Sequence, residues 1–188
     1  MKVIYILLTP FLLFGCTTTG MENKKDSLET SIQPKVEHAA VIVSDSTMGY
    51  DTYCNGRFGY CIDYPTAFIN KQPESANGDG CIFKDKTGEE VLRVYGSNNL
   101  DADGNTITLD HQFLVDVKRY ENDTDNTRIT YKKLAKLFFI LSGIKKGKIF
   151  YQKTILKDDA FAYAVLQYPE KEKTIYAEII NKTFSSFK

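Results

Sequence analysis

The chain has 188 residues with 24 basic and 24 acidic side chains, so its formal net charge is zero. This balance argues against a broad electrostatic surface for nucleic acid or anionic lipid, and we expect no nucleic-acid partner. From position 50 onward, about 140 residues are rich in aromatic and branched side chains, enough for one domain with a single core.

The first fifteen residues have the pattern of a secretory leader. Lys2 precedes an apolar run from Val3 to Phe14, and Gly15-Cys16 closes it. As a helix, this run would cover less than ~20 Å, which is too short for a hydrocarbon core of ~30 Å. The sequence therefore predicts a removable signal peptide over residues 1–15, with an ordinary short membrane anchor as the alternative.

The residues Leu13-Phe14-Gly15-Cys16 resemble the lipobox of bacterial lipoproteins, although Phe14 is larger than that pattern usually has. The resemblance implies cleavage before Cys16 and fatty acyl chains, such as palmitate, on this cysteine. Two or three chains hold a protein durably on a membrane. Because Thr17 rather than Asp follows, the resemblance implies the outer membrane, facing the periplasm, if the cell is Gram-negative.

Cys16 and the residues up to position 49 predict a flexible tether, because they are rich in Thr, Ser, Lys, Glu and Asp. One apolar island, at Ala39–Val43, offers an additional edge strand as the alternative. The globular domain is expected at 50–188.

The first predicted elements of the domain are strands. The alternation from Phe58 to Tyr64 predicts a strand that Pro65 ends. Cys81–Lys84 and Val91–Tyr95 predict a hairpin around Lys86-Thr87-Gly88.

A helix follows, because apolar residues recur at helical spacing from Leu109 to Tyr120, with Thr108 as its N-cap. After it we expect strands at Arg128–Lys133, Leu137–Ser142, Lys148–Leu156 and Phe161–Tyr168, with turns at 145–147 and 157–159. Pro169 is expected to open a last helix at its first position. The predicted apolar face of that helix comprises Ile175, Tyr176, Ile179, Ile180, Thr183, Phe184 and Phe187. The order predicts an α+β fold, a mostly antiparallel sheet covered by two main helices.

Several segments resemble a group of bacterial lipoproteins, and together they extend over 53–188. They are Tyr53–Pro65, Asn77–Gly80, Val94–Ser97, Lys148–Lys153, Tyr168-Pro169 and the closing Ile180–Phe187. Their order, with a strand that ends in Tyr-Pro, is similar to that of PsbP-type proteins, which include the DcrB lipoproteins. The resemblance implies an α/β/α sandwich and a family of binding and assembly factors, but it transfers no functional site.

Three cysteines remain besides Cys16, and export would place them where disulfides persist. Cys54 and Cys61 bracket Asn55-Gly56, a strong turn signal, so we expect a Cys54–Cys61 bridge. A Cys61–Cys81 bridge and three free thiols are the alternatives. A catalytic pair of Cys81 with His111 is a further hypothesis, against a small buried cysteine as the ordinary role.

Two loops are candidate ligand sites. Asn99, Asp101 and Asp103, with Asp110 later, place oxygen ligands at alternate positions around Gly104, as calcium requires. A solvated turn uses the same residues, so a plain loop is the alternative. We expect no cofactor other than this possible calcium ion.

The second candidate loop is Asn77-Gly78-Asp79-Gly80, where glycines would let the backbone approach a small molecule. A turn that requires positive φ is the alternative. Tyr95, Tyr151 and Tyr163 are the candidate aromatic side chains of a glycan groove, with core packing as the alternative.

Motifs of common enzyme classes are missing from the sequence. It has no Gly-rich phosphate loop, His/Cys metal spacing, Gly-x-Ser-x-Gly elbow or Ser-x-x-Lys. The carboxylate pairs Asp101/Asp103 and Asp158/Asp159 fall in predicted turns. We therefore expect a non-enzymatic envelope lipoprotein that binds a protein partner or supports envelope assembly. The alternatives are a small-molecule, calcium or glycan binder, a toxin-neutralising immunity lipoprotein, and a hydrolase without a local motif.

Overall fold

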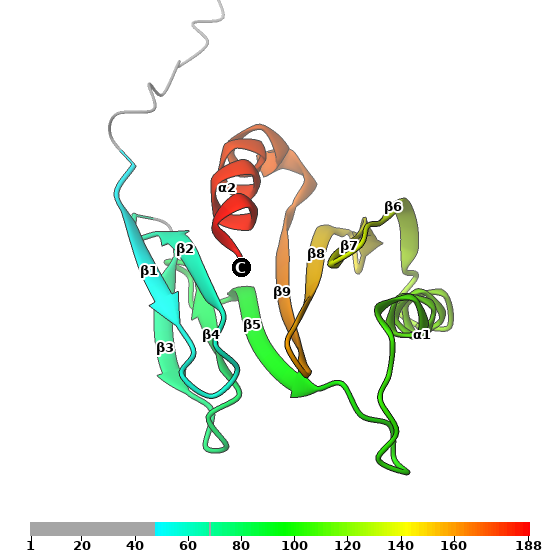
Figure 1. Cartoon of the computed structure of the whole chain (residues 1–188). Helices are drawn as coiled ribbons and strands as arrows, with labels where there is room; N and C mark the ends of the chain where they lie inside the picture. Colours follow the sequence, from blue (N-terminus) through cyan, green and yellow to red (C-terminus); the bar gives the residue numbers. More distant parts are fainter. Residues whose placement is uncertain (1–47, 68) are drawn as a thin grey trace, which may run out of the picture. The chain divides into compact units, whose positions relative to one another are not determined.

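The computed structural model describes residues 48–67 and 69–188 (Figure 1). The predicted leader, Cys16, the Ala39–Val43 island and the tether up to position 47 lie outside the described residues. The strands are β1 (Tyr50–Cys54), β2 (Cys61–Pro65), β3 (Asn70–Glu74), β4 (Gly80–Lys84), β5 (Glu90–Asn98), β6 (Arg128–Leu134), β7 (Phe138–Lys145), β8 (Lys148–Lys157) and β9 (Ala160–Pro169). The helices are α1 (Leu109–Glu121), a single 3₁₀ turn (Glu170–Glu172) and α2 (Lys173–Ser186).

Seven strands form one antiparallel sheet in the order β3-β4-β5-β9-β8-β7-β6. β1 and β2 form a separate antiparallel hairpin. The predicted α+β fold, with a mostly antiparallel sheet and two main helices, is therefore confirmed.

The hairpins β7–β8 and β8–β9 close over two-residue turns at the predicted positions. Lys146 and Gly147 have φ values of 51° and 72°, and Asp158 has a φ of 51°. Two-residue hairpin turns of this kind match the right-handed twist of the strands, which explains the positive φ values.

Alternation along the strands gives the sheet two apolar faces. One face forms a core with α2 and the β1–β2 hairpin, to which Phe83, Leu92 and Leu166 contribute. The other face forms a second core with α1, to which Phe139, Phe150 and Phe161 contribute. The helices therefore lie on opposite faces of the sheet, as the predicted sandwich requires.

Each helix covers only part of its face. α1 contacts β6 and β7, near one edge of the sheet, whereas α2 contacts β9 and the β2 strand of the hairpin. Among the described residues, this leaves two half-faces of the sheet open: β4, β5 and the part of β9 around Val165 on the α1 side, and β6 and β7 on the α2 side, where α2 reaches only β8. The predicted sheet between two helices is present, and each helix covers only part of its face.

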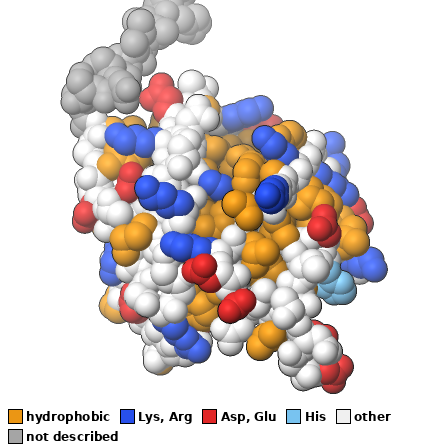
Figure 2. All heavy atoms as spheres, viewed as in Figure 1, with side chains coloured by type: hydrophobic (Ala, Val, Ile, Leu, Met, Phe, Trp, Pro, Cys, Tyr) orange, Lys and Arg blue, Asp and Glu red, His pale blue; other side chains and the backbone are white. Residues whose placement is uncertain are grey.

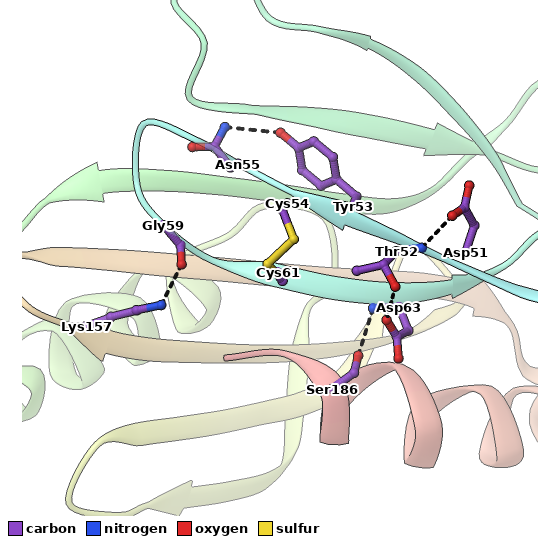
Figure 3. Close-up of a disulfide and its surroundings, with 10 residues drawn as sticks. All are labelled: Asp51, Thr52, Tyr53, Cys54, Asn55, Gly59, Cys61, Asp63, Lys157 and Ser186. Atoms are coloured by element: carbon purple, nitrogen blue, oxygen red, sulfur yellow. Dashed lines mark hydrogen bonds between the residues drawn. A yellow bond between two sulfur atoms is a disulfide. The ribbon is translucent and has the colours of Figure 1, made fainter.

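A disulfide joins Cys54 to Cys61 at the loop end of the β1–β2 hairpin (Figure 3). The predicted bridge is confirmed, and the alternatives of a Cys61–Cys81 bridge and of three free thiols are wrong. Cys81 is a buried free cysteine. The hairpin is also bound to α2, because the backbone N–H of Asp63 donates to Ser186 Oγ at 2.8 Å.

The predicted strand that begins at Phe58 is wrong in its first half. Residues 55–60 form a loop in which the side chain of Asn55 accepts hydrogen bonds from the backbone N–H groups of Arg57 and Phe58. Gly59 has a φ of 65°, which a strand does not allow. The alternation therefore continues through a turn, and β2 starts only at Cys61.

The start of the last helix also differs from the prediction. Pro169 ends β9 with extended backbone (φ −62°, ψ 140°), and the 3₁₀ turn lies between it and α2. Ile175, expected on the apolar face, is 48% exposed, whereas Tyr176, Ile179, Thr183 and Phe184 are buried. No helix within the described residues combines the length and apolar content needed to cross a bilayer.

Candidate functional site

An open groove of about 680 Å³ lies on the α1 side of the sheet, over the half-face that α1 leaves open. Its floor comprises Ile82, Arg93, Tyr95, Val165 and Gln167, which point outward from β4, β5 and β9. Arg119 and Tyr120 of α1 form one wall, and the segment from Gln72 to Asp79 forms the opposite wall. The groove is therefore built by the sheet itself, with one helix along its side.

Tyr95 forms the aromatic part of the floor. Its ring stacks on the ring of Tyr163, with centroids 4.6 Å apart and planes 9° apart. Tyr163 is buried and Tyr95 is half-buried. Burial raises the pKa of the Tyr95 phenol, so this side chain is neutral at physiological pH.

A buried polar network fixes the α1 wall. Asp116 is 3% exposed, and its carboxylate accepts hydrogen bonds from Gln112 at 3.1 Å and from Gln152 of β8 at 2.6 Å. Arg119 pairs with the same carboxylate at 3.2 Å, and the Tyr120 hydroxyl donates to Gln152 at 2.8 Å. Burial raises the pKa of Asp116. Because protein groups occupy both carboxylate oxygens, Asp116 positions Arg119 rather than serving as a base.

Cationic side chains predominate along the groove. Lys84, Arg93, Arg119 and Lys145 line it, against the two carboxylates of Asp79 and Glu90. Arg93 donates two hydrogen bonds to Glu90, at 2.8 and 2.7 Å. Arg119 and Lys145 also pair, with Asp116 and Asp123. The groove thus combines an apolar and aromatic floor with a rim of mostly paired charges.

The predicted ligand loop is partly at the groove. Asp79 and Gly80 line it, whereas Asn77 and Gly78 do not. Asp79 accepts hydrogen bonds from the side chains of Ser75 and Asn77, and the Ser75 bond contributes most to lowering its pKa. The backbone requires glycine at both positions: Gly78 has a φ of 68°, and a Cβ on Gly80 would lie 2.0 Å from the Val94 carbonyl oxygen.

The candidate calcium loop is closed by its own hydrogen bonds. One oxygen of the Asp101 carboxylate accepts from the backbone N–H groups of Asp103 and Asn105, at 2.9 and 2.8 Å. Asn99 is buried, and Asp110 lies exposed in the first turn of α1. Within residues 48–67 and 69–188, no cluster of three His, Cys, Asp or Glu side chains suitable for a metal is found. Calcium binding stays a prediction without a preformed ligand cluster in its support.

The hypothetical catalytic pair of Cys81 and His111 is wrong. Cys81 is 5% exposed and belongs to the core on the α2 side, whereas His111 lies exposed on α1, across the sheet. Burial raises the pKa of the Cys81 thiol to about 11, which makes it a poor nucleophile. The carboxylate pairs Asp101/Asp103 and Asp158/Asp159 are exposed in turns, as expected.

The three tyrosines proposed for a glycan groove do not lie together. Tyr95 and Tyr163 are stacked on the α1 side, but Tyr151 lies on the α2 side, against Phe184. The groove residues Arg93, Arg119 and Gln167 were not among the predicted site residues. The outward alternation of Arg93 and Tyr95 in β5 was the available signal, but the pattern does not tell which outward residues a helix covers.

Comparison with known proteins supports the fold and nothing finer. No protein-family model matches the chain, and no curated protein matches it. The solution structure of cyanobacterial PsbP (CyanoP) from Synechocystis sp. PCC 6803 is similar, with a TM-score of 0.56 and 15% sequence identity. The match covers 77% of this chain and 95% of that chain. The domain therefore has a PsbP-like fold, as the sequence resemblance implied, and at this identity the likeness carries no site with it.

Proposed function

We propose that the chain is a lipid-anchored, non-enzymatic binding protein of the cell envelope, and that the groove on the α1 side holds a segment of a protein partner. The observation that carries the proposal is the groove itself. Its floor offers apolar and aromatic surface, and its arginines are fixed by carboxylates before any partner arrives. Preorganised side chains reduce the entropy lost on binding, so such a groove suits recognition.

The chemistry of the groove favours binding over catalysis. The buried carboxylate of Asp116 is occupied by Gln112, Gln152 and Arg119. The thiol of Cys81, which lies beneath the floor, keeps its proton at physiological pH because its pKa is about 11. Arg93 and Arg119 keep about half of their side-chain surface exposed at the rim, so a partner segment that carries acidic and apolar side chains would complement them and the floor.

The lipid on Cys16 supplies the mechanism of the proposal. An extended tether of about 30 residues reaches up to ~100 Å, and as a coil it spans roughly 30 Å. Confinement near one membrane raises the effective concentration of the domain for partners on that membrane. Growth with labelled palmitate tests this step: the chain should carry label and lack residues 1–15, and a Cys16→Ser variant should carry none. An unlabelled chain that keeps its first fifteen residues would remove the anchor.

Site-specific photocrosslinking tests the groove. A photoreactive residue at Gln167, on the floor, should capture a discrete partner in the native cells, whereas one at Thr87, in the β4–β5 turn, should not. Arg93→Glu should abolish the capture because it replaces a cation of the rim with a carboxylate. Lys118→Glu, an equal charge change at an exposed position of α1 outside the groove, should leave it intact. Equal capture from positions 167 and 87 would contradict the proposal.

A small-molecule or glycan ligand is the second candidate, favoured by Asp79 and Gly80 at the rim and by Tyr95 in the floor. In this case the purified chain should bind soluble envelope glycans, and Tyr95→Ala should remove that binding. Capture of a protein at position 167 together with no change in glycan binding on Tyr95→Ala would decide for the partner segment.

A further inference from the structure

The basic residues of the chain are strongly segregated along the sequence. Between positions 128 and 157 there are nine basic residues and no acidic residue, although the whole chain is neutral. The nine are Arg128, Lys132, Lys133, Lys136, Lys145, Lys146, Lys148, Lys153 and Lys157. This segment consists of β6, β7 and β8 with their turns, which form one end of the sheet. The overall neutrality of the chain therefore does not extend to this segment.

On the α2 side of the sheet, α2 reaches only β8, where Phe184 packs on Tyr151, and among the described residues no helix covers β6 and β7. Tyr131, Phe138, Ile140, Ile144, Ile149 and Tyr151 share this face and are only partly buried or exposed. Figure 2 shows hydrophobic side chains gathered where Figure 1 places β6, β7 and β8, with Lys and Arg side chains among them. We call this surface, together with the β6–β7 turn, the basic apolar face.

The β6–β7 turn is the most exposed apolar part of the basic apolar face. Leu137 is 61% exposed, and Lys136 lies exposed beside it. Tyr131, in β6 beside the turn, is 49% exposed. Soluble surfaces rarely gather large apolar side chains in this way without a binding function.

The charges on the two sides of this end of the sheet differ. Four of the nine cations pair with carboxylates: Lys132 with Glu121 of α1, Lys145 with Asp123 and Lys146 with Asp125 of the loop after α1, and Lys148 with Glu89 of the β4–β5 turn. Arg128, Lys133 and Lys136 have no ion pair within the described residues. Three of the four acidic partners therefore belong to α1 and the loop after it, and the basic apolar face keeps a positive charge.

Lys133 and Lys153 are placed directly over the apolar floor. Their Nζ atoms lie 5.6 and 5.4 Å from the centre of the Phe138 ring. Lys153 also donates to the carbonyl oxygens of Phe184 and Phe187 at the end of α2, so it is fixed there. The neighbouring α2 adds two lysines, Lys173 and Lys182, and one carboxylate, Glu178, so the charge around this face stays positive.

We propose that the basic apolar face docks on an anionic phospholipid surface, with Tyr131 and Leu137 entering the headgroup region and the surrounding cations contacting lipid phosphates. Exposed Leu and Tyr side chains flanked by Lys are the residues that suit a membrane interface, because apolar parts enter it while ammonium groups reach the phosphates. Nucleic acid would use the positive charge but not the exposed Leu137. An anionic bilayer uses both features.

The proposal is independent of lipidation at Cys16, and it gives the domain an orientation. The groove of the proposed partner site lies on the α1 side of the sheet, whereas the basic apolar face lies on the α2 side. Docking on the bilayer would therefore keep the groove directed away from the lipid, where a partner segment can reach it.

A fluorescent probe in the β6–β7 turn tests the proposal in the full chain, isolated from cells and incorporated into vesicles. An environment-sensitive dye is attached to Leu137→Cys, since Cys81 is buried and the other described cysteines are bridged. In vesicles that contain phosphatidylglycerol, we expect a blue shift and a loss of acrylamide quenching. In phosphatidylcholine alone, or at high salt, the dye should stay quenched. A dye on Thr87→Cys should stay quenched in both.

Two double variants separate the face from total charge. The double variant Lys133→Glu with Lys136→Glu should leave the dye at position 137 accessible to acrylamide in vesicles that contain phosphatidylglycerol. The double variant Lys118→Glu with Lys188→Glu, which changes the net charge equally, should keep the dye protected. Melting temperatures confirm that each variant folds. Equal quenching at position 137 in both vesicle types overturns the proposal, as does equal loss in the two double variants. Protection only in native membranes, and not in lipid vesicles, would assign the face to an acidic protein instead.

Discussion

At the scale of single residues, burial decides what the chemistry-bearing side chains of this protein do. Cys81 has the functional group of a nucleophile, yet its burial in the core near Tyr53 of the β1–β2 hairpin keeps it protonated. Asp116 is similarly a carboxylate whose burial raises its pKa, and it serves to hold Arg119 at the groove. Sequence alone could name these residues but not their burial, because neither lies in a motif.

The titration of Cys81 follows from this burial. The pKa of the thiol in the folded chain is about 11, above the ordinary value of 9.0, so the unfolded chain loses this proton first. Its contribution to stability is therefore complete below about pH 9 and is lost as the pH rises toward about 11. The ultraviolet difference spectrum between the protein and its Cys81→Val variant should show a thiolate midpoint near 11. A midpoint near 9 would contradict the burial.

Thr183 offers a test of an unsatisfied polar group. This residue is fully buried in α2, and its hydroxyl has no hydrogen-bond partner in the structure. Because a buried hydroxyl without a partner costs free energy, Thr183→Val should raise the free energy of unfolding by about 1 kcal/mol. Urea denaturation measures the change, with Thr130→Val, at an exposed position of β6, as the control expected to change little. A lower stability for Thr183→Val would show that the hydroxyl is hydrogen-bonded.

At the scale of elements, the sequence predicted best where alternation and turn chemistry agree. The strands β7, β8 and β9 combine apolar alternation with two-residue turns, and all three are found where predicted. β1 and β3 were missed because their sequences, YDTYC and NKQPE, have little apolar alternation and β3 contains Pro73. β1 exists because β2 pairs with it, and β3 because β4 does, and these partnerships come from tertiary structure.

The disulfide should stabilise the β1–β2 hairpin by restricting the unfolded chain. Cys54 and Cys61 are seven residues apart, so the bridge closes a short loop. Replacing both with Ala should lower the free energy of unfolding by about 2–3 kcal/mol. Urea denaturation of the double variant and of the oxidised protein measures the loss. No difference between the two would indicate that the loop is equally constrained without the bridge.

The docking of the hairpin loop depends on Gly96 of β5. A Cβ at this position would lie 2.3 Å from Cγ of Phe58, whose ring packs on the sheet from the loop. Gly96→Ala should therefore displace Phe58 and cost about 1–3 kcal/mol of stability. Gly56→Ala, in the same loop but with nothing within 4 Å of its Cβ, is the matched control. Equal melting temperatures for the two variants would contradict the close packing.

At the scale of the whole molecule, the two helices cover opposite faces and different halves of the sheet. The two open half-faces differ in chemistry: the groove holds paired charges and stacked tyrosines, and the basic apolar face holds unpaired cations with exposed Tyr131 and Leu137. The sequence predicted the fold class and one bridge, but it did not predict either surface. Periodicity shows that a residue points outward from a strand, but the crossing position of a helix decides whether that residue stays exposed.

The most direct test is hydroxyl-radical footprinting of side chains in the native membranes, compared with the same chain extracted in detergent. In membranes, the account predicts protection of Tyr95 in the groove and of Tyr131 and Leu137 on the basic apolar face, with Leu114 on the outer side of α1 oxidised equally in both states. Extraction should expose both protected sets. Equal oxidation of Tyr95 in membranes and in detergent would contradict the claim that the groove holds a partner.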